Sequence, residues 1–153
     1  MQKNSQTIIV TNAQRFWVYY SAEQLAPKTY EIIRKRIPVV SARQLYEKKF
    51  PNDPSRWKTR TFIDLYNKPL EELMNTKDKK INKNLNLCKK FSFSKRADTI
   101  TNLIIIGDST NEMNAGVALH EELQYVQEDN ISDRGSNLSL RTIDINNAAK
   151  DIT

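Results

Sequence analysis

The sequence has 153 residues and a formal net charge of +6, and this length suits one domain with a buried core. Three glycines and five prolines exclude a linker or a fibrous protein, and the single cysteine, Cys88, excludes an internal disulfide framework. No stretch has the roughly 18 apolar residues of a membrane span, and the polar start is no signal peptide, so we expect a cytoplasmic or nuclear protein.

Strands and helices are predicted to alternate along the first half of the chain. Residues 7–11 are β-branched and apolar, which favours a short strand. Apolar residues at helical spacing predict a helix over residues 21–36, and a second short apolar strand follows at residues 37–40. Residues 41–50 predict a helix that ends before Pro51, and about 54–67 predict another.

The second half begins with a basic insertion, residues 67–99, whose composition is typical of a flexible loop. The continuous apolar run of residues 103–106 predicts a strand buried on both faces, and Gly107 allows a sharp turn at its carboxyl end. A helix over about 111–126 and a strand over about 138–145 complete the pattern. Strands separated by helices predict an α/β fold with a parallel sheet.

Polar residues follow these strands at the end where open α/β sheets bind ligands. Asp108 and Glu112 follow the apolar strand, where their carboxylates suit Mg²⁺. Thr11 and Asn12 end the first strand and suit phosphate oxygens, and Lys58 supplies a fixed cation from a helix. Each residue taken singly also has a purely structural interpretation. Asp108 could cap a helix, and Glu112 could interact with the dipole of the helix that begins beside it. Thr11 could be an ordinary strand residue, and Lys58 an ordinary surface lysine.

Four further residues have structural interpretations. Trp17 and Trp57 are predicted to be packing residues rather than a binding platform. His120 has no second histidine or nearby cysteine to complete a metal site, and Cys88 has no identifiable histidine partner. We therefore expect a structural or exposed histidine and a neutral thiol.

The positive charge is concentrated between Lys77 and Arg96, where eight of twenty residues are basic and only Asp78 is acidic. Phe91 and Phe93 lie among these cations, a pattern compatible with binding nucleic acid or phosphoinositide. A solvated basic loop explains the same charge, since no motif of a nucleic-acid-binding module accompanies it.

Three segments carry a resemblance to a known superfamily. They read VTNAQRFWVYYSAEQLAPKTYEII, IPVVSARQLYEKKFPNDPSRWKTRTF and TNLIIIGDSTNEMNA, within residues 7–120. In this order they resemble an uncharacterised eukaryotic branch of the haloacid dehalogenase-like superfamily, whose phosphatases have a Rossmann-like parallel sheet flanked by helices. The resemblance implies a Mg²⁺-dependent hydrolase of phosphate esters on a small molecule or protein. In it Thr11 and Asn12 hold phosphate, Lys58 stabilises charge, and Asp108 with Glu112 holds the metal.

The sequence departs from this pattern because it contains no Asp-x-Asp pair, which supplies the superfamily's nucleophile and its general acid. We therefore expect an incomplete core domain over residues 1–153, without the central strand that carries this pair between the strands ending at Thr11 and Ile106. A fragment or a degenerate paralogue explains the departure. The function is then a phosphatase-type domain that is inactive as printed, or a non-catalytic module that binds an anionic partner such as nucleic acid.

Overall fold

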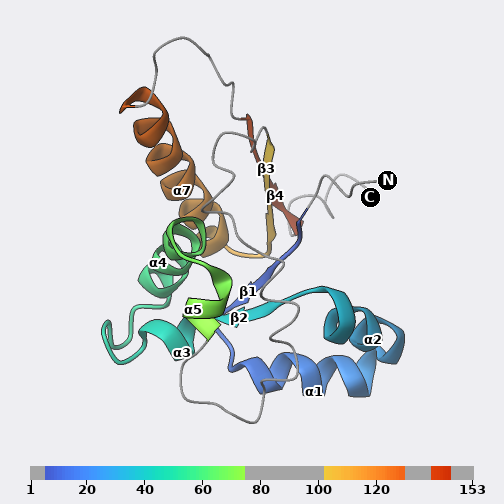
Figure 1. Cartoon of the computed structure of the whole chain (residues 1–153). Helices are drawn as coiled ribbons and strands as arrows, with labels where there is room; N and C mark the ends of the chain where they lie inside the picture. The colour runs from blue at the N-terminus through green and yellow to red at the C-terminus, as the bar shows by residue number, and fades with distance from the viewer. Residues whose placement is uncertain (1–5, 75–101, 130–138, 146–153) are drawn as a thin grey trace.

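The structure, a computed structural model, describes residues 6–74, 102–129 and 139–145, with only the backbone for residues 123–129. Short parallel strands lie among helices, so the described part of the chain is mixed α and β (Figure 1). Its strands form two separate two-stranded sheets, β1–β2 and β3–β4. Parallel pairing is confirmed, whereas these residues do not show a single Rossmann-like sheet.

The first sheet pairs β1 (Ile9–Thr11) with β2 (Val39–Ser41), residue for residue and in parallel. Every residue of β2 is buried, while those of β1 are half-buried. Pro38 precedes β2, and its carbonyl accepts a hydrogen bond from the Ile9 N–H at 3.0 Å. The strands predicted at residues 7–11 and 37–40 are thus both present, with shorter or shifted bounds.

Two helices, not one, connect these strands. They are α1 (Arg15–Leu25) and α2 (Pro27–Arg36), which contact each other. The prediction of one helix over residues 21–36 is wrong because Pro27 has no N–H to continue α1, while its fixed φ suits the first residue of a new helix. Trp17, on α1, is half exposed and stacks on Tyr20 with 5.5 Å between ring centroids.

Three helices follow β2: α3 (Ala42–Tyr46), α4 (Pro54–Asn67) and α5 (Leu70–Met74). The side chain of Ser41 caps α3, and that of Asp53 caps α4, each by accepting a backbone N–H of the first turn. Helix α4 matches the prediction closely because a capping residue and a proline at the first helical position mark its start.

Helix α5 corrects the predicted insertion at its beginning. Composition predicts a flexible loop for residues 67–74, yet Leu70 is 1% exposed and Leu73 is 7% exposed. Their burial against the core orders this stretch, although its charged neighbours gave it a polar composition. The remainder of the insertion, residues 75–99, lies outside the described residues, as does Cys88.

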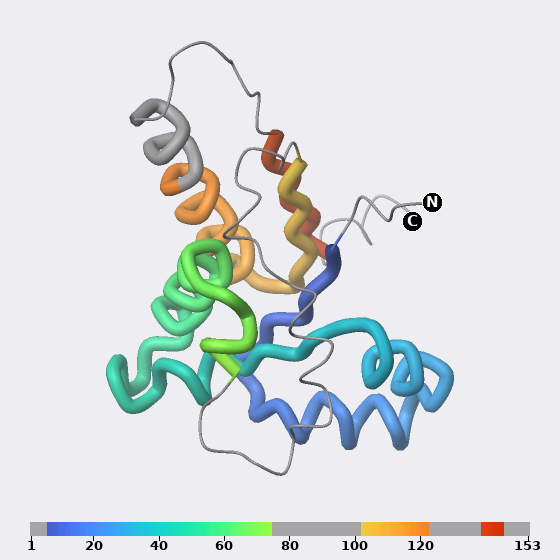
Figure 2. The backbone as a smooth tube through the Cα atoms, viewed as in Figure 1, coloured from blue at the N-terminus to red at the C-terminus, as the bar shows by residue number. Residues whose placement is uncertain are grey.

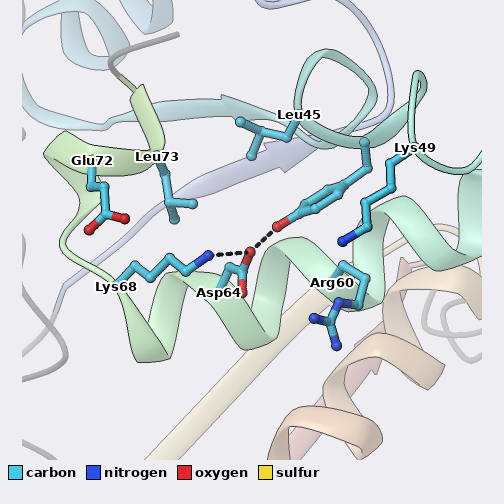
Figure 3. Close-up of a pocket in the computed structure, with 8 residues that line it drawn as sticks. Leu45, Lys49, Arg60, Asp64, Lys68, Glu72 and Leu73 are labelled. Atoms are coloured by element: carbon cyan, nitrogen blue, oxygen red, sulfur yellow. Dashed lines mark hydrogen bonds and ion pairs between the residues drawn. The ribbon is translucent and has the colours of Figure 1, made fainter.

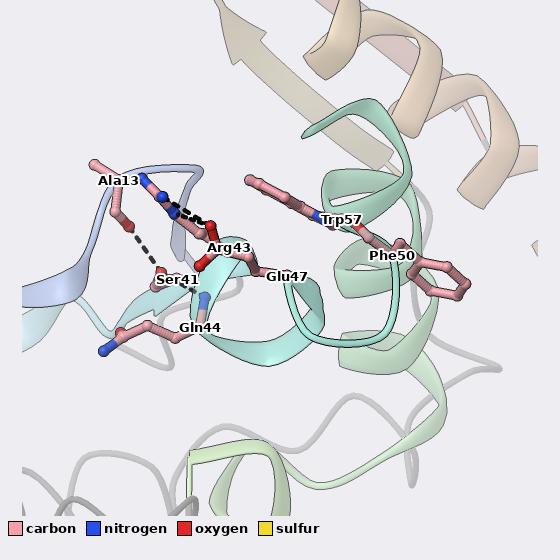
Figure 4. Close-up of polar contacts among 7 residues, drawn as sticks. All are labelled: Ala13, Ser41, Arg43, Gln44, Glu47, Phe50 and Trp57. Atoms are coloured by element: carbon pink, nitrogen blue, oxygen red, sulfur yellow. Dashed lines mark hydrogen bonds and ion pairs between the residues drawn. The ribbon is translucent and has the colours of Figure 1, made fainter. Parts of the chain in front are cut away.

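Polar contacts tie α3 to the first sheet and α4 to the loop that follows α3 (Figure 4). The Ser41 hydroxyl donates to the Ala13 carbonyl at 2.7 Å and accepts from the Gln44 N–H at 3.1 Å. The indole N–H of Trp57 donates to the Phe50 carbonyl at 2.6 Å. Because Trp57 is also 5% exposed, it is the packing residue that the sequence predicted.

The second sheet pairs β3 (Asn102–Gly107) with β4 (Ser139–Asp144), again in parallel. Helix α7 (Thr110–Asp129) contacts both strands and covers one face. On that face Ile105 packs so closely on Gly116 that a Cβ at this glycine would overlap the isoleucine side chain. The helix can therefore approach the strand only where it has no side chain.

The other face of this sheet is exposed. Ile104 and Ile106 are 57% and 61% exposed, and Ile143 and Ile145 are also exposed. The prediction that residues 103–106 are buried on both faces is therefore wrong for the described part of the chain. Helix α7 covers one face, and no other described element covers the second, so an apolar run alone did not determine two-sided burial.

Helix α4 connects the two halves of the molecule. It contacts β1 and α3 on one side and α7 on the other (Figure 2). The core on its β1 side contains the following buried apolar residues: Val40, Ala42, Tyr46, Trp57, Leu65, Leu70 and Leu73. None of the described helices is both long enough and apolar enough to cross a membrane.

Candidate functional site

The candidate site begins where β3 ends. The chain passes through Asp108 and Ser109 into α7, whose first turn contains Glu112. The Glu112 side chain lies directly over Gly107, where a Cβ would overlap it. Gly107 does not have a positive φ, so its role is to leave room for Glu112 rather than to permit the predicted sharp turn. The Ser109 hydroxyl donates a hydrogen bond to the Glu112 carboxylate.

Lys58 reaches this carboxylate from α4. Its ammonium group forms an ion pair with Glu112, and the two side chains are only 7% and 12% exposed. Burial lowers the pKa of Lys58, and the nearby Asp108 carboxylate raises it in part. The structure thus brings together three of the five predicted site residues, Lys58, Asp108 and Glu112. A buried cation that pairs with one carboxylate and lies near a second, at the carboxyl end of a parallel strand, makes this cluster the candidate site.

The other two predicted residues lie at the end of β1. The Thr11 hydroxyl accepts a hydrogen bond from the Ala13 N–H at 3.0 Å, which closes a local turn. The Asn12 amide donates to the Pro54 carbonyl at 3.2 Å and so ties β1 to the first turn of α4. Lys58 lies one helical turn beyond Pro54 on the same side of α4. Helix α4 therefore links Asn12 to the Lys58 cluster.

Asn12 has one further property that bears on ligand binding. Its side-chain carbonyl oxygen is buried, and no hydrogen-bond partner for it occurs among the described residues. A buried acceptor without a partner costs about 1–3 kcal/mol, so it is a position where an additional donor would stabilise the protein. A protonated phosphate oxygen or a bound water is such a donor.

The donor set determines how Mg²⁺ would fit. Within the described ranges, no three side chains of His, Cys, Asp or Glu converge as a metal site. The two carboxylates fit a magnesium ion that keeps several waters and takes further ligands from phosphate, a common arrangement for this ion. Glu112 becomes available to a metal when Lys58 and Ser109 release its oxygens.

Sequence reasoning missed Ser109 as a partner of Glu112. The Ser-x-x-Glu spacing was the available signal, since a residue three positions before an acid in the first turn reaches its side chain. It also assigned no chemistry to Tyr46, whose hydroxyl donates to the buried Asp64 carboxylate. The basic residues from Lys77 to Arg96 lie outside the described residues, so the nucleic-acid alternative stays a prediction.

No family model matches this chain, and neither a curated protein nor a solved structure matches it. The predicted resemblance to the haloacid dehalogenase-like superfamily therefore rests on the ordered sequence motifs alone. The cluster of Lys58, Asp108 and Glu112 rests on the structure and does not depend on that likeness.

Proposed function

We propose that this chain carries a phosphate-binding and magnesium-binding site of the haloacid dehalogenase-like type, which in the printed sequence binds a phosphorylated ligand without hydrolysing it. The observation that supports this most is the burial of Lys58 beside Asp108 and Glu112 at the end of β3. Burying a cation is costly, and a structural ion pair is often replaceable by apolar residues without loss of stability. Binding of an anionic ligand to the Lys58 ammonium group would explain why the protein buries this charge.

In the proposed binding, Lys58 exchanges the Glu112 carboxylate for the phosphoryl group of the ligand. Lys58 turns from Glu112 to an oxygen of the phosphoryl group, where a lysine acts as a point charge. Asp108, with the released Glu112, would hold Mg²⁺, which neutralises phosphate charge when bound. Thr11 and Asn12 supply polar groups at the end of β1, which Asn12 ties to the first turn of α4. The same cations would stabilise charge in a transition state, but the printed sequence offers no Asp-x-Asp nucleophile to start hydrolysis.

The binding test is calorimetry with inorganic phosphate, in the presence and absence of Mg²⁺. We expect phosphate to bind more tightly with Mg²⁺, and Lys58→Met to weaken binding by at least about tenfold, since a hydrogen bond to a charged group contributes about 1.5–3 kcal/mol. Asp108→Asn should remove the Mg²⁺ dependence. Lys28→Met, an exposed lysine of α2, is the matched control and should bind like the wild type. An affinity for phosphate that changes neither with Mg²⁺ nor in Lys58→Met would contradict the proposal.

The second test concerns turnover. With Mg²⁺ and p-nitrophenyl phosphate we expect no release of nitrophenol above the rate without protein. Turnover that is abolished by Asp108→Asn would show that the site is catalytic as printed and would refute the inactive assignment. Turnover that survives this substitution would indicate a contaminating phosphatase, because the proposed metal ligand would then be irrelevant to it.

A further inference from the structure

A second polar site lies on another side of α4. A pocket of about 280 Å³ opens between α3, α4 and α5. Figure 3 shows Asp64 at its centre, with Lys49 and Arg60 on one side and Lys68 and Glu72 on the other. Arg60 is two residues from Lys58, so the two side chains leave the helix about 200° apart. The pocket is therefore separate from the cluster at the end of β3.

The floor of this pocket is the Asp64 carboxylate, which already has a hydrogen-bond donor and a cation as partners. Asp64 is 8% exposed, accepts a hydrogen bond from the Tyr46 hydroxyl, and pairs with Lys68 at 3.3 Å. Burial and the Asp64 carboxylate both raise the pKa of Tyr46, so this tyrosine remains a neutral donor. The negative charge of Asp64 is thus already compensated within the protein, and it leaves the other cations of the pocket available.

Two of those cations have no carboxylate partner among the residues that the structure describes. Arg60 lies one turn before Asp64 on the same side of α4, and Lys49 follows α3. Both are exposed, and within the part of the chain that the structure describes neither forms an ion pair. Three cations and two carboxylates line the pocket, counting Glu72, so the lining carries one excess positive charge.

Apolar walls complete the pocket. Leu45 and Leu73 line it, and Leu73 is 7% exposed as part of the core. Figure 3 places Leu73 on the side of Asp64 away from Arg60, and Leu45 above Asp64. A ligand that fills the pocket therefore contacts the planar guanidinium group of Arg60 at one end and aliphatic side chains at the other. Arginine presents paired N–H groups that match the two oxygens of a carboxylate.

We propose that this pocket binds a singly charged carboxylate that carries a short aliphatic chain. Arg60 holds the carboxylate, Lys49 adds a second positive charge, and Leu45 with Leu73 covers the chain. The one excess charge of the lining matches a monoanion better than a phosphate dianion. This site is independent of the proposed magnesium site, because neither Lys58 nor Asp108 contributes to it.

The test is a titration followed by amide NMR, with butyrate as the probe and with acetate and butanol as comparisons. We expect saturable shifts confined to α3, α4 and α5, and tighter binding of butyrate than of acetate by about fourfold per buried methylene. Arg60→Gln should weaken butyrate binding by at least about tenfold, and Lys49→Gln should weaken it less. Arg36→Gln on α2 is the matched control and should change affinity by less than about twofold.

Several outcomes would overturn this proposal. Shifts spread over all surface cations would indicate unspecific ion binding, and an unchanged affinity in Arg60→Gln would remove the arginine from the site. Equal binding of butanol would show that charge is irrelevant, and tighter binding of phosphate would refute the monoanion class. The double variant Lys58→Met/Glu112→Gln, which removes the whole ion pair, should bind butyrate like the wild type, and a loss of binding there would show that the two sites are not separate. That control also separates a failure here from a failure of the proposed function.

Discussion

Replacing Lys58 by methionine tests whether the buried cation and its carboxylate partner form one energetic unit. Methionine keeps the length and apolar stem of lysine but removes the charge, so packing within α4 is largely retained. It leaves the Glu112 carboxylate, 12% exposed, with the Ser109 hydroxyl as its remaining hydrogen-bond donor in the described part of the chain. A buried charge that loses its partner is strongly destabilising.

The size of the effect follows from this geometry. Breaking a buried ion pair costs about 3–5 kcal/mol, and we expect the lower end because Ser109 and the amino terminus of α7 still favour the carboxylate. Adding Glu112→Gln removes the orphaned charge, so the double variant should return to within about 1 kcal/mol of the wild type. Burial also lowers the pKa of Lys58, which means that the pair carries a desolvation cost that the double variant no longer has.

The assay is urea unfolding followed by circular dichroism, with the free energy of unfolding extrapolated to water. All variants should show the same dependence on urea, since none changes the surface exposed on unfolding. Lys28→Met, which removes an exposed charge from α2, should change the free energy by less than about 0.5 kcal/mol. A loss below about 1 kcal/mol in Lys58→Met, or a double variant whose loss equals the sum of the single losses, would refute the reasoning.

Three further predictions test other parts of the structure. Burial and the neighbouring Asp64 raise the pKa of Tyr46, so the folded state keeps the tyrosine proton to higher pH than the unfolded state does. The free energy of unfolding should therefore fall as pH rises above 10.0. In Tyr46→Phe, unfolding curves measured at alkaline pH should show a smaller fall. Gly107→Ala should cost about 1–3 kcal/mol in urea unfolding because its Cβ meets the Glu112 side chain, and an unchanged midpoint would place Glu112 elsewhere. Asp53→Ala should cost about 1 kcal/mol by removing the cap of α4, whereas Asp53→Asn should cost little.

The alternation of strands and helices was predictable because local signals marked most boundaries. Asp53 followed by Pro54 marks the start of α4, and Ser41 marks that of α3. The same local signals failed where packing decides. Helix α5 forms because Leu70 and Leu73 reach the core, which composition did not reveal. The open face of β3 was not predictable either, since burial depends on which elements cover the sheet and not on the run itself.

The candidate site likewise contains residues that local sequence predicted and one that only packing brings there. Asp108 and Glu112 are close in sequence, and their position after an apolar strand was enough to place them together at its end. Lys58 is 54 residues away from Glu112 in the sequence, so no spacing rule connects the two. Only the packing of α4 on α7 brings the ammonium group to the carboxylate.

This packing also explains why one helix can serve two sites. Because α4 contacts α7 on one side and α3 with α5 on others, polar residues about half a turn apart face different surroundings. Lys58 is directed to the end of β3, where burial makes its charge costly and gives it carboxylate partners. Arg60 remains exposed beside Asp64, where a charge costs little and an incoming carboxylate can reach it. The two binding proposals therefore require different environments, and a substitution at one position should leave binding at the other unchanged.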